Sequence, residues 1–279
     1  MDAPLVRAFL ASLRDDPPDE KALERVRTCL ATLQSPDVRY LVGRVSGSGA
    51  AAIARVARAV LEAAGARTGI LGRDVGGIEL DGGAIDDALL GAAGTLAAAS
   101  AYQIGTTDPG LGELTRREVV VILGLVAFAE ASRRVALLVD EVVDMSDPLY
   151  APRPDLVVIG AADAHHLEAA LSRVPEGCPV VVAPLADGEL ERVERLVIDR
   201  GIPALVGGRD YGVRETDGSI EFVVRDEPYV TVAPVPGVEV SDLATGIAAA
   251  LGLGVLGIRM REDWVLAGID ALRAVPATT

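Results

Sequence analysis

The sequence predicts an α/β fold in three layers, a mainly parallel sheet flanked by helices, with a small antiparallel β extension. Short apolar runs of strand length alternate with amphipathic helical segments between residues 40 and 206. Such alternation is typical of a parallel sheet that helices cover on both faces. After Tyr211 the rhythm changes to short segments around Asp217-Gly218, a dipeptide that favours hairpin turns.

The length and composition favour one large domain. A chain of 279 residues, half of them apolar and only 3% aromatic, can bury a full core built from Ala, Val, Leu and Ile. We expect a single domain over residues 1–279. Its parts are a helical lead-in (1–38), a parallel α/β core (39–210) and a final part with antiparallel strands and two closing helices (211–279).

Charge and composition exclude several classes of function. The formal net charge of −15 argues against binding to nucleic acid or anionic membranes. No apolar run of about 18 residues lacks a charge or a break, so no membrane-spanning helix is expected. The N-terminus has no cationic segment leading into an apolar stretch, as a secretory signal would. Cys29 and Cys178 are far apart and fit reduced thiols. We therefore expect a cytoplasmic protein.

The first elements follow from periodicity and turn residues. Two helices precede residue 36, separated by an Asp-Asp-Pro-Pro stretch, and the second covers 20–33. A strand at 40–45, a Gly-Ser turn at 46–49, a helix at 50–64 and a strand at 68–71 come next. The helix carries one apolar stripe at helical spacing, which we expect to pack on the sheet: Ile53, Val56, Ala57, Val60, Leu61 and Ala64.

The remaining elements are assigned in the same way. A short extended piece at 78–80 precedes a helix of small residues at 85–101 and a loop at 105–112. Thr115 and Glu118 form a capping-box pattern that opens a helix reaching about residue 132. The later expected strands are 135–139, 155–159, 180–183, 204–206, 211–214, 220–224 and 229–235, and the later expected helices are 164–173, 189–200, 241–251 and 261–274.

The strand, glycine turn and helix at 40–64 have the form of a phosphate cradle, in which free backbone N–H groups point outward. A nucleotide-binding loop also needs a Lys for the phosphates and a hydroxyl for Mg²⁺. Those positions hold Ser48 and Ala50. The turn is therefore either a tight structural connection or a remnant anion site, whose candidate residues are Arg44, Ser46, Gly47, Ser48 and Gly49.

The order of motifs resembles the ATP-dependent central domain of folylpolyglutamate synthetases and their Mur-ligase relatives. The similar stretches are 23–26, 30–36 and 40–43 before the turn, 63–70 after it, and Leu114-Thr115-Arg116-Arg117-Glu118. The resemblance implies a P-loop NTPase-like fold. It also implies that Glu118, Asp147 and His165 occupy the positions of Mg²⁺ ligands.

The departures from that family fall on its chemistry. Besides the lost Lys and hydroxyl, Ala164 replaces the Asp that precedes the metal-binding His, and Lys21 is the only Lys. From the resemblance we also expect this chain to lack the family's third, C-terminal domain. Local explanations also exist for the metal candidates: Glu118 fits a capping box, Asp147 fits a turn initiator before Pro148, and a His at a helix start fits a solvated side chain.

We therefore expect a degenerate, non-catalytic ligase-like domain, a pseudoenzyme with no cofactor. It would act by binding a partner protein, a second copy of itself or a small anionic ligand in the former active-site cleft. The alternative is an active ATP- and Mg²⁺-dependent acid–amino acid ligase, completed by a partner subunit that supplies the missing domain. A third hypothesis is a structural subunit that dimerises through its Ala-rich helices.

Overall fold

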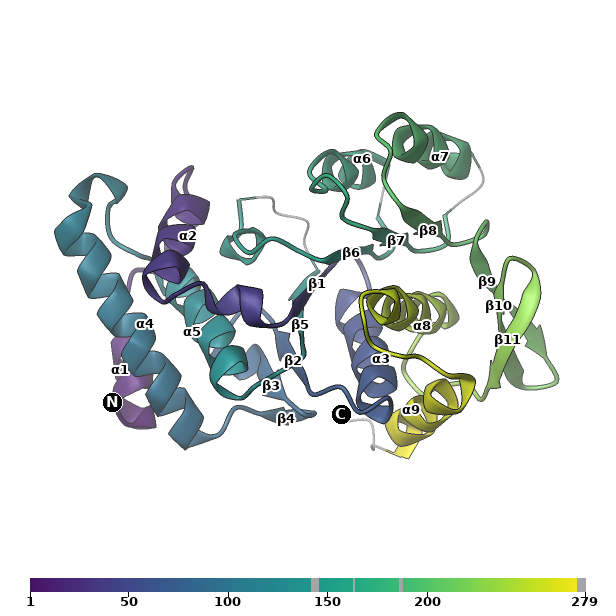
Figure 1. Cartoon of the computed structure of the whole chain (residues 1–279), viewed down its shortest axis with the longest axis horizontal. Helices are drawn as coiled ribbons and strands as arrows, with labels where there is room; N and C mark the ends of the chain where they lie inside the picture. The colour runs from purple at the N-terminus through teal and green to yellow at the C-terminus, as the bar shows by residue number, and fades with distance from the viewer. Residues whose placement is uncertain (142–145, 163, 186–187, 275–279) are drawn as a thin grey trace. The chain divides into compact units, whose positions relative to one another are not determined.

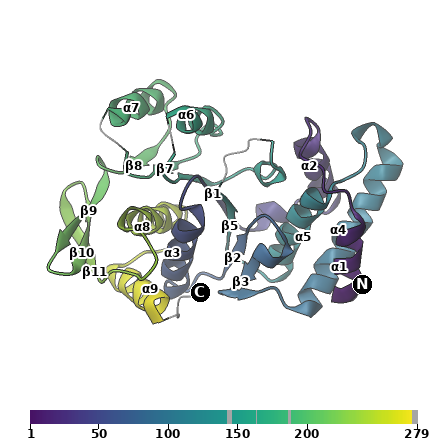
Figure 2. The same cartoon turned by 180° about the vertical axis from the view of Figure 1, so that it is seen from behind.

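The computed structural model describes residues 1–141, 146–162, 164–185 and 188–274. The chain divides into two compact units, each built from separate stretches of sequence. Unit 1 comprises Met1–Val42, Arg67–Leu138 and Asp144–Arg153, and unit 2 comprises Gly43–Ala66, Val139–Val143 and Pro154–Thr279. Figures 1 and 2 show the elements from opposite sides.

Within the described residues, eight strands form a mainly parallel sheet in the order β4-β3-β2-β5-β1-β6-β7-β8. Their bounds are β1 Leu41–Ser46, β2 Thr68–Leu71, β3 Ile78–Leu80, β4 Gly83–Ala84, β5 Val135–Asp140, β6 Leu156–Ile159, β7 Val180–Val182 and β8 Ala204–Val206. β2 pairs in parallel with β5, β1 with β6, β6 with β7, and β7 with β8, whereas β3 runs antiparallel to β2 and β4. The predicted three-layer fold class is confirmed.

The described part of unit 1 contains four α-helices, of which α5 lies next to β2 and the other three lie farther from the strands (Figure 1). They are α1 Ala3–Ser12, α2 Ala22–Thr32, α4 Asp87–Thr107 and α5 Arg116–Glu130. Helix α5 is almost entirely apolar and is buried from Val119 to Phe128. The ring of Phe128 meets Tyr40 edge-on with centroids 6.2 Å apart, and the Tyr40 hydroxyl donates to the Leu125 carbonyl oxygen at 3.0 Å. These contacts bind α5 firmly into the core of unit 1.

Unit 2 has helices on both faces of strands β6 to β8 (Figures 1 and 2). Helices α6 Ala164–Ser172 and α7 Glu189–Asp199 lie on one face, and α3 Ala50–Ala63, α8 Val240–Val255 and α9 Glu262–Ala274 lie on the other. The predicted apolar stripe of α3 is buried from Ile53 to Leu61. Val56 packs against α8 at Gly246, where an added Cβ would lie 2.5 Å from the Val56 Cβ. Ile53 of the same stripe lies beside Gly160, the residue after β6, with its Cδ1 3.0 Å from an added Cβ there. The stripe therefore contacts α8 and the end of the sheet.

The antiparallel extension is a separate sheet in the order β11-β10-β9, with β9 Tyr211–Thr216, β10 Ser219–Val224 and β11 Glu227–Val232. Asp217 and Gly218 join the first two strands with φ of +42° and +80°, which confirms the predicted hairpin turn. Arg225 and Asp226 make the second turn, also with positive φ. This turn starts β11 two residues before the predicted Tyr229.

Helix α4 is longer than predicted. It begins at Asp87 because the Asp86 carboxylate caps it by accepting from the Leu89 N–H at 2.8 Å. It continues past residue 101 because Ile104 lies on the same buried face as the preceding turns. The sequence places a loop from residue 105, since a Gly and two Thr residues favour loops, and this boundary was wrong by three residues.

Candidate functional site

The glycine turn forms as predicted between β1 and α3. Strand β1 ends at Ser46, helix α3 begins at Ala50, and Gly49 is its N-cap residue. Gly47 and Gly49 have φ of +97° and +77°, a left-handed conformation that favours glycine. The two glycines are therefore required by the backbone path of the turn, whatever it binds.

The first N–H groups of this turn are bonded within the protein. Gly47 donates to the Asp140 carbonyl oxygen at 3.0 Å, and Ser48 donates to the Ala161 carbonyl oxygen at 2.9 Å. The Ala50 N–H bonds back to the Gly47 carbonyl oxygen at 3.1 Å. A phosphate cradle needs such groups pointing outward. The first two donors instead fix the turn to the chain at the ends of β5 and β6, and the third closes the turn on itself.

A carboxylate lies directly on the turn. Asp242, in the first turn of α8, is 9% exposed. A Cβ built on Gly49 would lie 2.4 and 2.5 Å from the two Asp242 carboxylate oxygens. Burial raises the pKa of Asp242, and the nearby negative charge of Glu239 raises it further. Within the described residues this carboxylate makes no hydrogen bond or ion pair, so its negative charge remains at the N-terminus of α3.

The side chains of the predicted anion site are mostly inaccessible. Arg44 is 6% exposed on β1, in register with Val157 of β6. Ser46 is 1% exposed, and its hydroxyl donates to the Val158 carbonyl oxygen at 3.5 Å, a weak contact. Ser48 is exposed at the tip of the turn. Of the side chains proposed to contact an anion, only that of Ser48 reaches solvent.

Glu118 is fully buried in unit 1 and has two structural partners. Its carboxylate accepts from the Thr115 N–H at 3.1 Å while its own N–H donates to the Thr115 hydroxyl at 3.4 Å, which confirms the capping box. The Arg25 guanidinium donates to both carboxylate oxygens, at 2.6 and 2.9 Å. The hydrogen bonds to Glu118 in turn raise the pKa of Arg25. A cation from α2 therefore already neutralises this carboxylate.

Asp147, the second metal candidate, has an equivalent arrangement. The Arg117 guanidinium donates to its two carboxylate oxygens at 2.9 and 3.1 Å, and a third N–H of Arg117 donates to the Gly72 carbonyl oxygen. The Leu149 N–H also donates to the Asp147 carboxylate, at 2.8 Å. Asp147 begins the short 3₁₀ helix at Pro148–Tyr150, so its predicted role as a turn initiator is confirmed.

His165 lies in the first turn of α6 in unit 2, whereas Glu118 and Asp147 lie in unit 1. Its convergence with these two carboxylates stays a prediction. Among the described residues, no group of three or more His, Cys, Asp or Glu side chains has the arrangement of a metal site. The loop between β5 and Asp147 also carries carboxylates that could hold a cation, and one of them, Asp144, lies outside the described residues.

No pattern in the sequence identifies the residues that pair with these candidate groups. Arg25 belongs to a phrase that resembles the ligase family, but nothing in its spacing marks it as an ion-pair partner for a residue on another helix. Asp242 follows Ser241 at a helix start, where an acidic residue is ordinary. Its contact with Gly49 depends on how α8 packs against α3, which only the structure shows.

Three solved structures show the same fold. An apo form of the Lactobacillus casei folylpolyglutamate synthetase has a TM-score of 0.83 and 20% identity, with 100% of this chain and 73% of that chain covered. A folylpolyglutamate synthetase–AMPPCP–folate complex has a TM-score of 0.80 and 20% identity, covering 96% of this chain and 71% of that chain. The Mycobacterium tuberculosis folylpolyglutamate synthase complexed with ADP has a TM-score of 0.74 and 18% identity, with 97% of this chain and 65% of that chain covered.

These similarities establish a folylpolyglutamate synthetase-like fold, the one implied by the sequence motifs. At about 20% identity they concern the fold alone. No family model matches the sequence, and no curated protein does. Among the described residues, no helix is long and apolar enough to cross a membrane.

Proposed function

We propose that this chain is a ligase-fold domain that does not catalyse ATP-dependent amide-bond formation and acts by binding, to a partner protein or to a small anionic ligand elsewhere on its surface. The observation that carries this proposal is the position of Asp242 on Gly49, at the point where a nucleotide phosphate would meet the turn.

The electrostatics of this contact oppose nucleotide binding. Two unit charges 4 Å apart interact by about 4 kcal/mol at an effective dielectric constant near 20, and a triphosphate carries several negative charges. A conventional phosphate loop offsets such repulsion with a Lys and Mg²⁺. Here Ser48 and Ala50 stand at those positions, and the turn presents a carboxylate instead. The residues around this turn do not fit Mg²⁺-ATP.

The buried ion pairs of unit 1 support the same proposal. Glu118 and Asp147 each accept two hydrogen bonds from a guanidinium group, and their side chains are 0% and 6% exposed. An oxygen ligand of Mg²⁺ must have a lone pair facing the ion. Arg25 and Arg117 occupy the carboxylate edges from which such an ion would be held, so we infer that the two arginines replace the cation as the balancing charge.

The test is thermal unfolding with millimolar ATP and Mg²⁺. A ligand at 100 times its dissociation constant adds about 2.7 kcal/mol, a shift of roughly 5–10 °C for a chain of this size. We expect almost no shift for the parent protein. A Ser48→Lys, Ala50→Thr variant should also shift little, because Asp242 still lies on the turn. Adding Asp242→Asn to that variant should produce a magnesium-dependent shift.

The matched control is Asp270→Asn, which removes one exposed acidic charge from α9 while leaving the turn intact. It should change neither the melting temperature in ATP nor its dependence on Mg²⁺. A clear magnesium-dependent shift in the parent protein would contradict the proposal. That result would favour the alternative, an acid–amino acid ligase completed by a partner subunit.

A further inference from the structure

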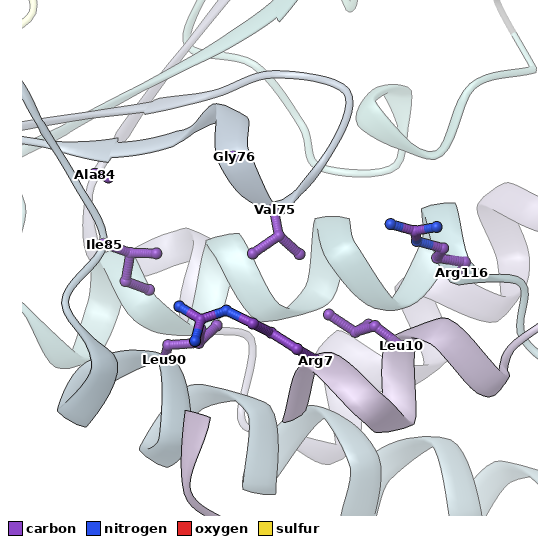
Figure 3. Close-up of a pocket in the computed structure, with 8 residues that line it drawn as sticks. All are labelled: Arg7, Leu10, Val75, Gly76, Ala84, Ile85, Leu90 and Arg116. Atoms are coloured by element: carbon purple, nitrogen blue, oxygen red, sulfur yellow. The ribbon is translucent and has the colours of Figure 1, made fainter. Parts of the chain in front are cut away.

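A pocket of about 400 Å³ lies wholly within unit 1 (Figure 3). It is bounded by α1, by the loop between β2 and β3, by β4 and by the first turns of α4 and α5. Its apolar lining comes from Leu10, Val75, Ile85 and Leu90. It shares no residue with the glycine turn or with the ion pairs of Glu118 and Asp147.

Two arginines also line this apolar pocket. Figure 3 shows the Arg7 side chain running beside Leu90 and Ile85, with Arg116 at the other end beyond Leu10. The Arg7 charge is partly balanced by Asp87, and the pocket lining itself contains no acidic residue. The arrangement provides positive charge and apolar contact surface in the same cavity.

Both guanidinium groups are available to a ligand. Arg7 pairs with Asp87 at 2.7 Å, but the two side chains are 55% and 70% exposed, and a surface pair of this kind holds its partners weakly. Arg116 is the first residue of α5, and within the described part of the chain its guanidinium has no hydrogen bond or ion pair. Each arginine can therefore donate hydrogen bonds to an anion bound among the apolar side chains.

We propose that this pocket binds a small organic carboxylate with an apolar body. The carboxylate would accept charge-assisted hydrogen bonds from Arg7 and Arg116, whose exposed side chains would turn towards it from opposite ends of the pocket. The apolar body would contact Leu10, Val75, Ile85 and Leu90. The volume lies within the range of small-molecule sites, and apolar walls with a few placed polar groups are their usual composition. This inference rests on the proposed function, because it assigns a pocket and a chemical class to the small anionic ligand.

The mixed lining of the pocket disfavours two simpler ligands, inorganic phosphate and a neutral apolar molecule. Inorganic phosphate would pair with the arginines but leave the apolar lining exposed to water, so its binding should be weak. A neutral apolar molecule would offer no acceptor to Arg116 and no charge to compete with Asp87 for Arg7. Only a ligand that combines a carboxylate with an apolar body satisfies both parts of the lining.

The experiment is isothermal titration of the full chain with 2-naphthoate, and with 2-naphthamide and inorganic phosphate for comparison. We expect naphthoate to bind at least about tenfold more tightly than the neutral amide, because hydrogen bonds between two charged groups are stronger than those to a neutral acceptor. Arg7→Met and Arg116→Met should each weaken naphthoate binding by about tenfold, since Met keeps most of the apolar stem and loses the donors. Ala84→Phe, which adds a ring to the pocket lining, should abolish it.

Arg55→Met is the matched control, since Arg55 is an exposed arginine on α3 and lies outside the pocket. It should bind naphthoate like the parent protein. Equal binding of acid and amide, unchanged affinity in both pocket variants, or no binding of naphthoate at millimolar concentration would each overturn the proposal. The Ser48→Lys, Ala50→Thr variant should leave naphthoate binding unchanged, so the outcome is separable from that of the ATP experiment.

Discussion

Replacing Arg25 by Met tests whether the buried ion pair with Glu118 is a structural unit. The Arg25 and Glu118 side chains are 3% and 0% exposed, with the closest N–O distance at 2.6 Å. Removing one partner of a buried pair typically costs about 3–5 kcal/mol, because the other charge stays buried without compensation. For a chain of this size the loss corresponds to a melting temperature lower by roughly 6–15 °C.

The assay is thermal unfolding followed by circular dichroism, with two comparison variants. Asp19→Asn removes the other carboxylate that contacts Arg25; since that side chain is 58% exposed, the cost should stay below about 1 kcal/mol. Adding Glu118→Gln to Arg25→Met removes the buried charge yet keeps a residue that can complete the capping box. This double variant should recover about half of the lost stability.

The reasoning would be refuted if Arg25→Met melted like the parent protein, or if the double variant were no more stable than Arg25→Met alone. A gain of stability in millimolar Mg²⁺, appearing only when Arg25 is absent, would have a separate meaning. It would show that Glu118 can ligate the ion once its guanidinium partner is removed.

Three further outcomes are expected. Val56→Asp should destabilise unit 2 by several kcal/mol, because the new carboxylate would face Gly246 without a partner. Val56→Ala should cost only about 1–3 kcal/mol, and urea unfolding distinguishes the two variants. Burial raises the pKa of the Cys29 thiol to about 11 from its ordinary 9.0, so the thiol's contribution to stability is complete below pH 9 and is lost as the pH rises towards 11. The urea midpoint should therefore be lower at pH 10 than at pH 8, and this decrease should be smaller in a Cys29→Ala variant. Gly218→Ala should cost about 1 kcal/mol because Gly218 has φ of +80°, whereas Gly105→Ala, with no neighbour within 4 Å of its added Cβ, should cost no stability in the same melt.

The fold could be predicted because local signals agree with the tertiary structure along most of the chain. The stripe from Ile53 to Leu61 requires a buried helix, and the apolar run at 135–139 requires a strand covered on both faces. Errors fall where tertiary packing decides the boundary. Ile104 extends α4 because it reaches the buried face, and β11 begins early because Arg225 and Asp226 adopt positive φ without a glycine.

The candidate site was harder to predict because its chemistry depends on pairs of residues from different elements. The pattern Thr115 to Glu118 predicts a capping box, and it forms, but the same carboxylate also accepts from Arg25 of α2. A sequence motif identifies a carboxylate at a position, not the group that neutralises it. The metal interpretation and the ion-pair interpretation of Glu118 therefore share one sequence signal and differ only in the contacts.

The glycine turn illustrates the same limit for a backbone motif. Gly47 and Gly49 are needed wherever a strand turns sharply into a helix, because their positive φ is strained for other residues. A phosphate loop adds a second requirement, that the space in front of Gly49 be free for an anion. Here the Asp242 carboxylate fills that space, and it lies where the N-terminus of α3 favours negative charge. The Asp242 side chain of α8 thus occupies the place that an anionic ligand would take at this turn. A turn with preserved geometry is therefore compatible with the loss of nucleotide binding.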